Sequence, residues 1–330
     1  MRCFANSRKI TAMGLVLRPV SAQSTCWRAT RRPPRPRVAM KFADIGQQLR
    51  SYRLESGLRA EEIAARLGVS RAALYRYEKG EVIKLDTIRR LAELLKISPL
   101  SLLGIGVEYF ARPAGFQERL RQTEEQADQI MVLGGALCLQ VATEGLEGAI
   151  AEAWAEMAEA SGERAQARAA AEQLLGLIQA RRRLHAQRRP TLTVLLGESA
   201  VRRLLAEGLC GGHRLSERVA LRCRHAARME VEQLANLMES GPIGVQVGLI
   251  AGPEPSSPFI LLRGRERSHV VTGPFPPDAA PPGGTGVAMI TAGEDAVAIH
   301  QRVTESTWRD SLKGPTAAER LRAILRETPL

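Results

Sequence analysis

The sequence predicts a multidomain protein in which a short all-α domain precedes an α+β domain. The 330 residues exceed the usual size of one domain. Residues 41–104 show five short helical patterns separated by Gly, Ser and Asp, whereas after residue 190 short β-branched runs alternate with helical patterns. With 45% hydrophobic and 25% charged residues, the composition is globular and excludes collagen-like and wholly disordered chains.

The net charge of +12 is unevenly distributed along the chain. Residues 1–39 hold nine Arg or Lys and no acidic residue, residues 41–104 hold twelve basic and eight acidic residues, and residues 105–330 hold 26 and 27. A basic excess attracts the phosphates of nucleic acids. The excess lies in the N-terminal extension and, more weakly, in the domain that follows it.

Residues 1–40 are predicted to be a disordered basic extension. They end in a Pro-Arg tract that cannot hold a helix. Three explanations stay open: translation that truly starts at Met40, an organelle transit peptide, or a basic arm that contacts phosphates.

Cysteine and histidine usage does not indicate a metal site or a disulfide framework. The five cysteines are scattered without CxxC spacing. Cys223 lies on the apolar stripe of a predicted helix, while His225 faces elsewhere, so a zinc site shared with Cys210 and His213 is not expected. No nucleophile elbow, HExxH or phosphate loop is present. We therefore expect no enzyme, no metal and no cofactor.

The longest apolar run, 130–139, is too short for a membrane span and contains two glycines. The sequence therefore predicts a soluble protein, and its scattered cysteines favour a reducing compartment, the cytoplasm.

The helices of residues 41–104 are delimited by local signals. Ile45, Leu49 and Tyr52 form one face of a first helix that Gly57 ends. A second helix spans 60–67 and is stopped by Gly68, and Ser70 is a good N-cap for a third helix over 71–79. Asp86 is expected to cap a fourth helix, and Ser98-Pro99 to open a fifth.

This series resembles the XRE (Cro/C1 repressor-type) helix-turn-helix family over residues 42–104. The residues that carry the resemblance are Gly57-Leu58, Glu62-Ile63-Ala64, Leu67-Gly68-Val69-Ser70, Leu74, Glu78-Lys79-Gly80 and Leu91-Ala92-Leu95. The resemblance implies a five-helix, lambda-repressor-like domain whose recognition helix is 71–79. One departure is Arg59-Ala60, where many relatives have Ser/Thr-Gln, so base preferences are not transferred.

Side chains on the N-terminal half of a recognition helix reach base edges in the major groove. Arg71 is predicted to bond guanine, Ala72 to contact a thymine methyl, and Tyr75 to make one hydrogen bond to a base. The predicted phosphate contacts, which position a protein without reading sequence, are Ser70, Arg76, Lys79 and Lys84. For each charged residue the alternative is a solvated surface position.

Arg53 and Glu78 occupy positions that often form a buried ion pair in the resembled family. Such a pair would tie the first helix to the recognition helix and act structurally.

Residues 105–180 are predicted to be a helical linker or dimerisation region. Leu146, Ile150, Trp154 and Met157 recur every three or four residues and form an apolar stripe. The stripe either packs within the chain or forms a dimer seam.

Residues 181–330 are predicted to be an α+β regulatory or partner-binding domain. They resemble the C-terminal domain of actinobacterial XRE regulators, which is often encoded beside a small partner protein. The residues that carry this resemblance are Glu198, Arg202, Gln233-Leu234, Val245 to Val247 and Pro258-Phe259. A ligand of this domain does not follow from these residues.

Together these patterns predict a sequence-specific DNA-binding transcriptional regulator, with repression as its output. One recognition helix reads only a few base pairs, so a homodimer on a palindromic double-stranded operator is expected. The alternative is an antitoxin-like autoregulatory protein whose C-terminal domain binds a small partner protein.

Overall fold

The computed structural model describes residues 42–103, 106–273, 275, 284 and 286–329. The predicted basic extension of residues 1–40 lies outside the described residues.

The N-terminal helical domain is built around a fully buried apolar core. Its helices are α1 (Phe42–Ser56), α2 (Ala60–Leu67), α3 (Arg71–Glu78), α4 (Leu85–Leu95) and α5 (Pro99–Leu102). One leucine or isoleucine from each helix has no exposed surface: Leu49, Ile63, Leu74, Leu91 and Leu102. Gly68 ends α2 with a φ of 71°, a left-handed conformation that glycine adopts without a Cβ clash.

The predicted cap of the fourth helix is wrong by two residues. α4 begins at Leu85 with Lys84 as its N-cap, and Asp86 lies in the first turn. There its carboxylate interacts favourably with the positive end of the helix dipole. It also lies 3.5 Å from the Arg89 guanidinium.

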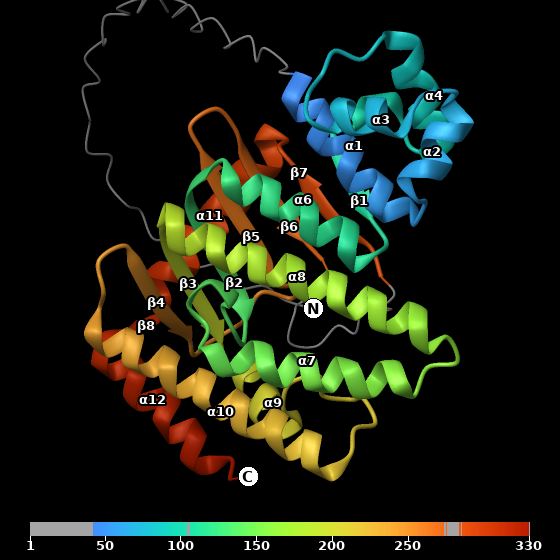
Figure 1. Cartoon of the computed structure of the whole chain (residues 1–330). Coiled ribbons are helices and arrows are strands. Elements are labelled where there is room, and N and C mark those ends of the chain that lie inside the picture. The colour runs from blue at the N-terminus through green and yellow to red at the C-terminus, as the bar shows by residue number, and fades with distance from the viewer. Residues whose placement is uncertain (1–41, 104–105, 274, 276–283, 285, 330) are drawn as a thin grey trace, which may run out of the picture. The chain divides into compact units, whose positions relative to one another are not determined.

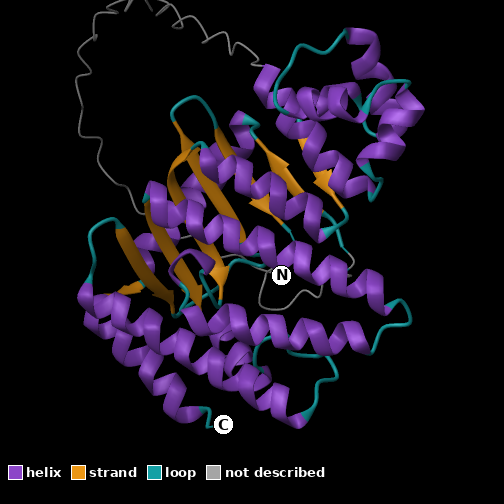
Figure 2. Ribbon diagram, viewed as in Figure 1, coloured by secondary structure: helices purple, strands orange, loops and turns teal. Residues whose placement is uncertain are grey.

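The rest of the described chain forms a mixed sheet with helices on both faces (Figures 1 and 2). The order of the eight described strands is β1-β7-β6-β5-β2-β3-β4-β8. Their bounds are β1 (Val107–Phe110), β2 (Ala127–Gly135), β3 (Thr191–Gly197), β4 (Val245–Ile250), β5 (Phe259–Gly264), β6 (Ser268–Thr272), β7 (Ala288–Thr291) and β8 (Leu312–Lys313). Helices and a mixed sheet in this arrangement agree with the predicted α+β class.

The centre of the sheet is parallel, and its flanks are antiparallel. Val132 of β2 lies beside Val194 of β3, which lies beside Val247 of β4. Parallel neighbours require long crossovers. One runs through the 3-10 turn η1 (Leu139–Val141), α7 (Glu144–Glu159) and α8 (Arg164–Arg188), and the other through α9 (Glu198–Glu207) and α10 (Glu217–Ser240).

Alternating side chains of the central strands pack into two separate clusters, one on each face. Val194 and Leu262 belong to the cluster beneath α6 (Pro113–Glu125), α7, α8, α10 and α12 (Gly314–Glu327). Leu195 and Leu261 belong to the second cluster, against which Trp308 of α11 (Glu294–Asp310) packs. Successive side chains of a strand point to opposite faces. Because both faces of these strands are covered, consecutive residues in them are apolar.

Residues 105–180 are not purely helical, contrary to the sequence prediction. They contribute the edge strand β1 and the inner strand β2, and β2 pairs with both β3 and β5. α6 ends at Glu125, and the chain then enters β2 at Ala127. The run 130–135 is apolar enough for either a buried helix or a buried strand, and only pairing with distant strands distinguishes the two.

The apolar stripe of α7 packs within the chain. Leu146, Ile150 and Trp154 are at most 1% exposed, and α7 contacts α8 and α10. The stripe is therefore part of the core and does not present a dimer seam. Among the described helices, none is sufficiently long and apolar to cross a membrane.

Candidate nucleic-acid interface

Helix α3 is held by its buried side and presents the other side to solvent. The Ser70 hydroxyl accepts a hydrogen bond from the Ala73 amide at 3.1 Å, which starts the helix. Ala73 and Leu74 are buried, whereas Arg71 and Tyr75 are exposed. A short helix anchored in this way is suited to present side chains to a groove.

The three predicted base-contacting residues lie together on the exposed side of α3. Arg71 Nη2 donates to the Tyr75 hydroxyl at 3.3 Å, and its guanidinium carbon lies 5.4 Å from the centre of the Tyr75 ring. Ala72 is also exposed. The stacked ring limits the conformations of the Arg71 side chain, which lowers the entropy that a contact would cost.

Arg71 also has an acidic neighbour from α2. Its Nη1 lies 2.8 Å from Oε1 of Glu61, and both side chains are more than half exposed. An exposed pair of this kind contributes little to stability, so the guanidinium is able to exchange Glu61 for another acceptor.

The predicted phosphate-contacting residues have different surroundings. Ser70 caps α3, and Arg76 forms an exposed ion pair with Glu81 at 2.8 Å. Lys79 and Lys84 are exposed at the C-cap of α3 and the N-cap of α4. Ser70 and Lys79 thus stand at the two ends of α3, Arg76 lies within it, and Lys84 begins the next helix.

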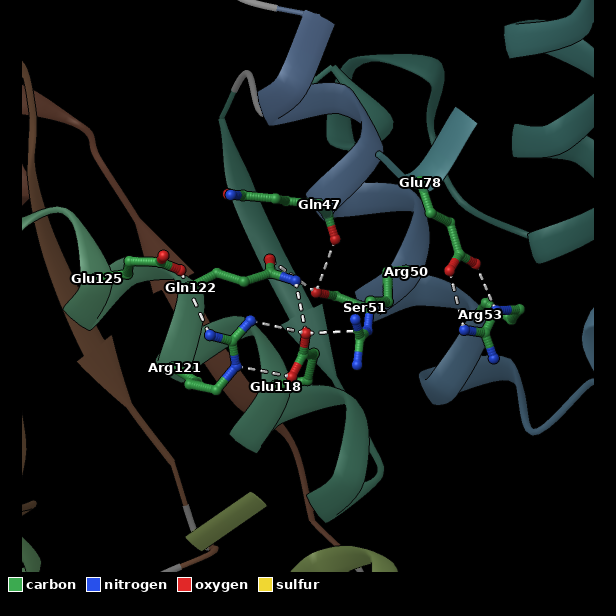
Figure 3. Close-up of polar contacts among 9 residues, drawn as sticks. All are labelled: Gln47, Arg50, Ser51, Arg53, Glu78, Glu118, Arg121, Gln122 and Glu125. Atoms are coloured by element: carbon green, nitrogen blue, oxygen red, sulfur yellow. Dashed lines mark hydrogen bonds and ion pairs between the residues drawn. The ribbon is translucent and has the colours of Figure 1, made fainter. Parts of the chain in front are cut away.

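Arg53 and Glu78 join α1 to α3 through a two-pronged ion pair (Figure 3). Arg53 Nε donates to Glu78 Oε1 at 2.6 Å and Nη2 to Oε2 at 3.1 Å, and the two side chains are 14% and 6% exposed. Burial lowers the pKa of Arg53, but the hydrogen bond to the Glu78 carboxylate and its negative charge together outweigh this effect and leave the pKa raised. The pair therefore sets the position of α3 on α1.

Gly46 lets the same two helices approach closely. A Cβ at this position would lie 2.5 Å from the Tyr77 carbonyl oxygen and 2.7 Å from that of Glu78. The C-terminal end of α3 thus rests directly on the backbone of α1.

The sequence did not predict a second polar cluster, which joins α1 to α6 (Figure 3). Ser51 donates to the Gln122 side-chain oxygen at 3.2 Å, and Arg50 Nε lies 3.1 Å from Glu118 Oε1. Arg121 and Gln122 also donate to Glu118, whose side chain is 1% exposed. Polar residues on a helix usually indicate a solvated face, so no local signal identifies this contact.

The start of α6 is held by a carboxylate from α1. Glu55 accepts hydrogen bonds from the backbone amides of Ala111 and Arg112, the latter at 3.0 Å. Burial raises the pKa of Glu55, and these amide bonds offset only part of that effect. α1 therefore contacts both α3 and α6.

Comparison with family models gives one match within this region. Residues 44–102 match the model described as a helix-turn-helix domain. The comparison with curated proteins returned no relative.

Comparison with solved structures includes TrmBL2, an archaeal chromatin protein whose structure shows a novel mode of DNA binding. The TM-score is 0.31 and the identity 11%, over 69% of this chain and 61% of that chain. The chain thus spans about three fifths of that protein, and a likeness this low carries no functional argument. On the family match and its geometry, residues 44–102 are a helix-turn-helix domain, the kind of domain with which many regulators bind DNA.

Proposed function

We propose that the chain is a sequence-specific DNA-binding transcriptional regulator that acts on chromosomal DNA in the cytoplasm and represses transcription. The observation that carries the proposal is the exposed side of α3, where Arg71, Ala72 and Tyr75 lie together. Arg71 reads guanine through O6 and N7, and the other two contact neighbouring bases. The proposal includes no catalytic step.

The polar and basic residues in and next to α3 support this assignment. Ser70 and Lys79 cap α3, Arg76 lies within it and Lys84 caps α4, and phosphate contacts from these positions would fix the register of the helix on the duplex. The basic excess of residues 41–104 favours the same partner.

A single α3 reads too few base pairs to select a site in a genome. We therefore propose a homodimer on a palindromic operator, with half-sites about 10 base pairs apart or a multiple of that distance. Sedimentation of the full chain, alone and with operator DNA, measures this stoichiometry.

The experiment that tests the function is selection of sheared genomic DNA by the full-length protein at near-physiological salt. Enrichment of a palindromic sequence is the expected result. The double variant Arg71→Ala/Tyr75→Ala should lose this enrichment. Arg326→Ala is the matched control, because it removes the same charge from an exposed position of α12 outside the helix-turn-helix domain.

Circular dichroism of each variant separates loss of binding from loss of folding. Selection of the same sequences by the double variant would refute the assignment of α3 as the reading element. Absence of enrichment together with co-purification of a small partner protein would favour the antitoxin-like alternative.

A further inference from the structure

A cavity of about 320 Å³ lies between α6, the sheet and α9. Its walls are mainly apolar, and the buried residues include Phe116, Leu120, Leu133, Phe259, Val271 and Phe275. The rings of Phe116 and Phe275 are tilted against each other with their centres 5.9 Å apart. Sites for small molecules commonly begin at about 300 Å³.

The cavity is placed where open sheets commonly bind ligands. It adjoins the carboxyl end of β2, from Val132 to Gly135, and the start of β5 at Phe259. β2 has a parallel neighbour, β3, on one side and an antiparallel neighbour, β5, on the other. Ligands of open sheets with parallel strands commonly bind outside the carboxyl ends of those strands.

The buried polar groups of the lining already have partners. Arg181 donates to Glu124 at 2.7 and 2.8 Å, and Gln140 donates to Glu124 at 2.8 Å. Gln117 donates to the Phe275 carbonyl at 3.1 Å. These bonds leave no unpaired buried charge among these groups to balance a charged ligand, so an ion entering here would lose its hydration without compensation.

Two further features of the lining fit an uncharged, mostly apolar ligand. Burial raises the pKa of the Cys138 thiol to about 12, so this side chain is neutral near pH 7. Arg203 and Glu207 of α9 are exposed lining residues of opposite charge. They mark the solvent side of the cavity, where a single polar substituent of a ligand would lie.

The volume limits the size of the ligand. An apolar cavity of about 150 Å³ binds benzene. At 320 Å³ the present cavity has room for a molecule of about two rings.

Helix α6 forms a wall of this cavity and also contacts the helix-turn-helix domain. Phe116, Gln117 and Leu120 line the cavity, whereas Glu118 and Gln122 contact α1. A displacement of α6 by a ligand would therefore act on α1, and α1 holds α3 through Arg53 and Glu78.

We propose that this cavity is a binding site for a small, uncharged, mainly apolar molecule of about two rings, and that α6 transmits its occupancy to α1. The regulatory meaning of the site rests on the proposed function. The binding itself does not, and it is measured without DNA.

The probe is 1-aminonaphthalene, a two-ring aromatic amine that is neutral at pH 7 and whose emission shifts to shorter wavelength in apolar surroundings. Titration of the full-length protein is expected to show saturable binding of one probe per chain. Ala200→Trp fills the cavity from α9 and should weaken binding by at least about tenfold. Ala206→Trp, an exposed change on the same helix that does not line the cavity, should change it less than about twofold.

Ala200→Leu, a smaller obstruction, keeps the test available if the tryptophan variant does not fold. Lack of saturable binding, or equal binding by the Ala200 and Ala206 variants, would overturn the site. A second titration uses 5-aminonaphthalene-1-sulfonate, which adds a charge to the same two rings. It should bind at least about tenfold more weakly, and equal or tighter binding at this cavity would overturn the uncharged class of ligand.

Hydrogen exchange measures the transmission without DNA. Saturation with the neutral probe is expected to change amide exchange in α6 and in residues 45–56 of α1, and Ala200→Trp should abolish both changes. A change confined to α6 would overturn the transmission to α1. Absence of operator binding would count against the proposed function but would leave the binding and exchange results intact.

Discussion

Gly115 of α6 lies directly against Glu55 of α1. A Cβ on Gly115 would be 2.8 Å from Oε2 and 3.0 Å from Cα of Glu55. The two helices therefore approach more closely at this point than a residue with a side chain would permit. The contact contributes to joining the helix-turn-helix domain to the sheet domain.

Gly115→Ala is therefore expected to destabilise the protein, although Gly→Ala within a helix normally stabilises it. The methyl group must displace Glu55, and overpacking of this kind costs roughly 1–3 kcal/mol. Gly176→Ala in α8 is the matched control, because nothing lies within 4 Å of the added atom. It should raise the free energy of unfolding by up to about 1 kcal/mol, as measured by urea denaturation. Stabilisation by both substitutions would contradict the close contact.

Glu78→Gln should lower the free energy of unfolding of the helix-turn-helix domain by roughly 3–5 kcal/mol, because Arg53 loses its partner while it stays largely buried. Arg76→Ala on the same helix breaks a pair whose members are 64% and 49% exposed. Its cost should be at most about 1 kcal/mol. Equal costs in denaturant titrations would show that burial does not distinguish the two pairs.

Arg71→Ala and Lys79→Ala should weaken DNA binding in different ways. As a base contact, Arg71 should account for roughly 1–3 kcal/mol at one operator position, and its loss should relax the preference there. Lys79→Ala should weaken all sequences equally and reduce the salt slope by about one. Titration of operator and random DNA over a range of salt concentrations separates the two. Equal losses on both DNAs for Arg71→Ala would rule out base reading.

His269 should make the stability of the sheet domain fall below neutral pH. Burial, together with the nearby Arg119 guanidinium, lowers the pKa of His269 to about 4. Between about pH 6.5 and 4 the unfolded chain binds a proton that the folded chain does not, so stability is present above pH 6.5 and is lost as the pH falls. The total loss from this group is about 3 kcal/mol.

The test for His269 compares urea unfolding of the wild type and His269→Phe at pH 7 and pH 5. Carboxylates also titrate below neutral pH, so only the difference between the two proteins reports on His269. The variant should lose less stability between these pH values, and identical losses would argue against a buried neutral imidazole.

The sequence predicted the helix-turn-helix domain in detail because its signals are local. The second helix was expected over 60–67, and α2 spans Ala60–Leu67. Gly68 and Ser70 mark the turn through their own backbone and side-chain chemistry, independently of distant residues. Strands β3 to β7 were found for a similar reason, since each is a short β-branched or apolar run between turn residues. The two-residue strand β8 was not predicted, because such a short segment has no pattern of its own.

The region around α6 and β2 could not be predicted in the same way. Glu118 and Gln122 resemble the solvated face of a helix, and their burial depends on α1, which lies more than 60 residues away in sequence. The cavity is lined by several distant elements, so no sequence window contains its pattern. Long-range packing therefore determines the features that local propensity does not show.

The buried polar side chains of α6 have a consequence for exchanging domains between proteins. Glu118 has Arg50 as a partner, and Glu108 of β1 accepts a hydrogen bond from Gln48 at 2.8 Å. A foreign helix-turn-helix domain grafted at residue 104 would leave these carboxylates without their α1 partners. Functional chimaeras of this protein should therefore carry α1, β1 and α6 together, as one inherited unit.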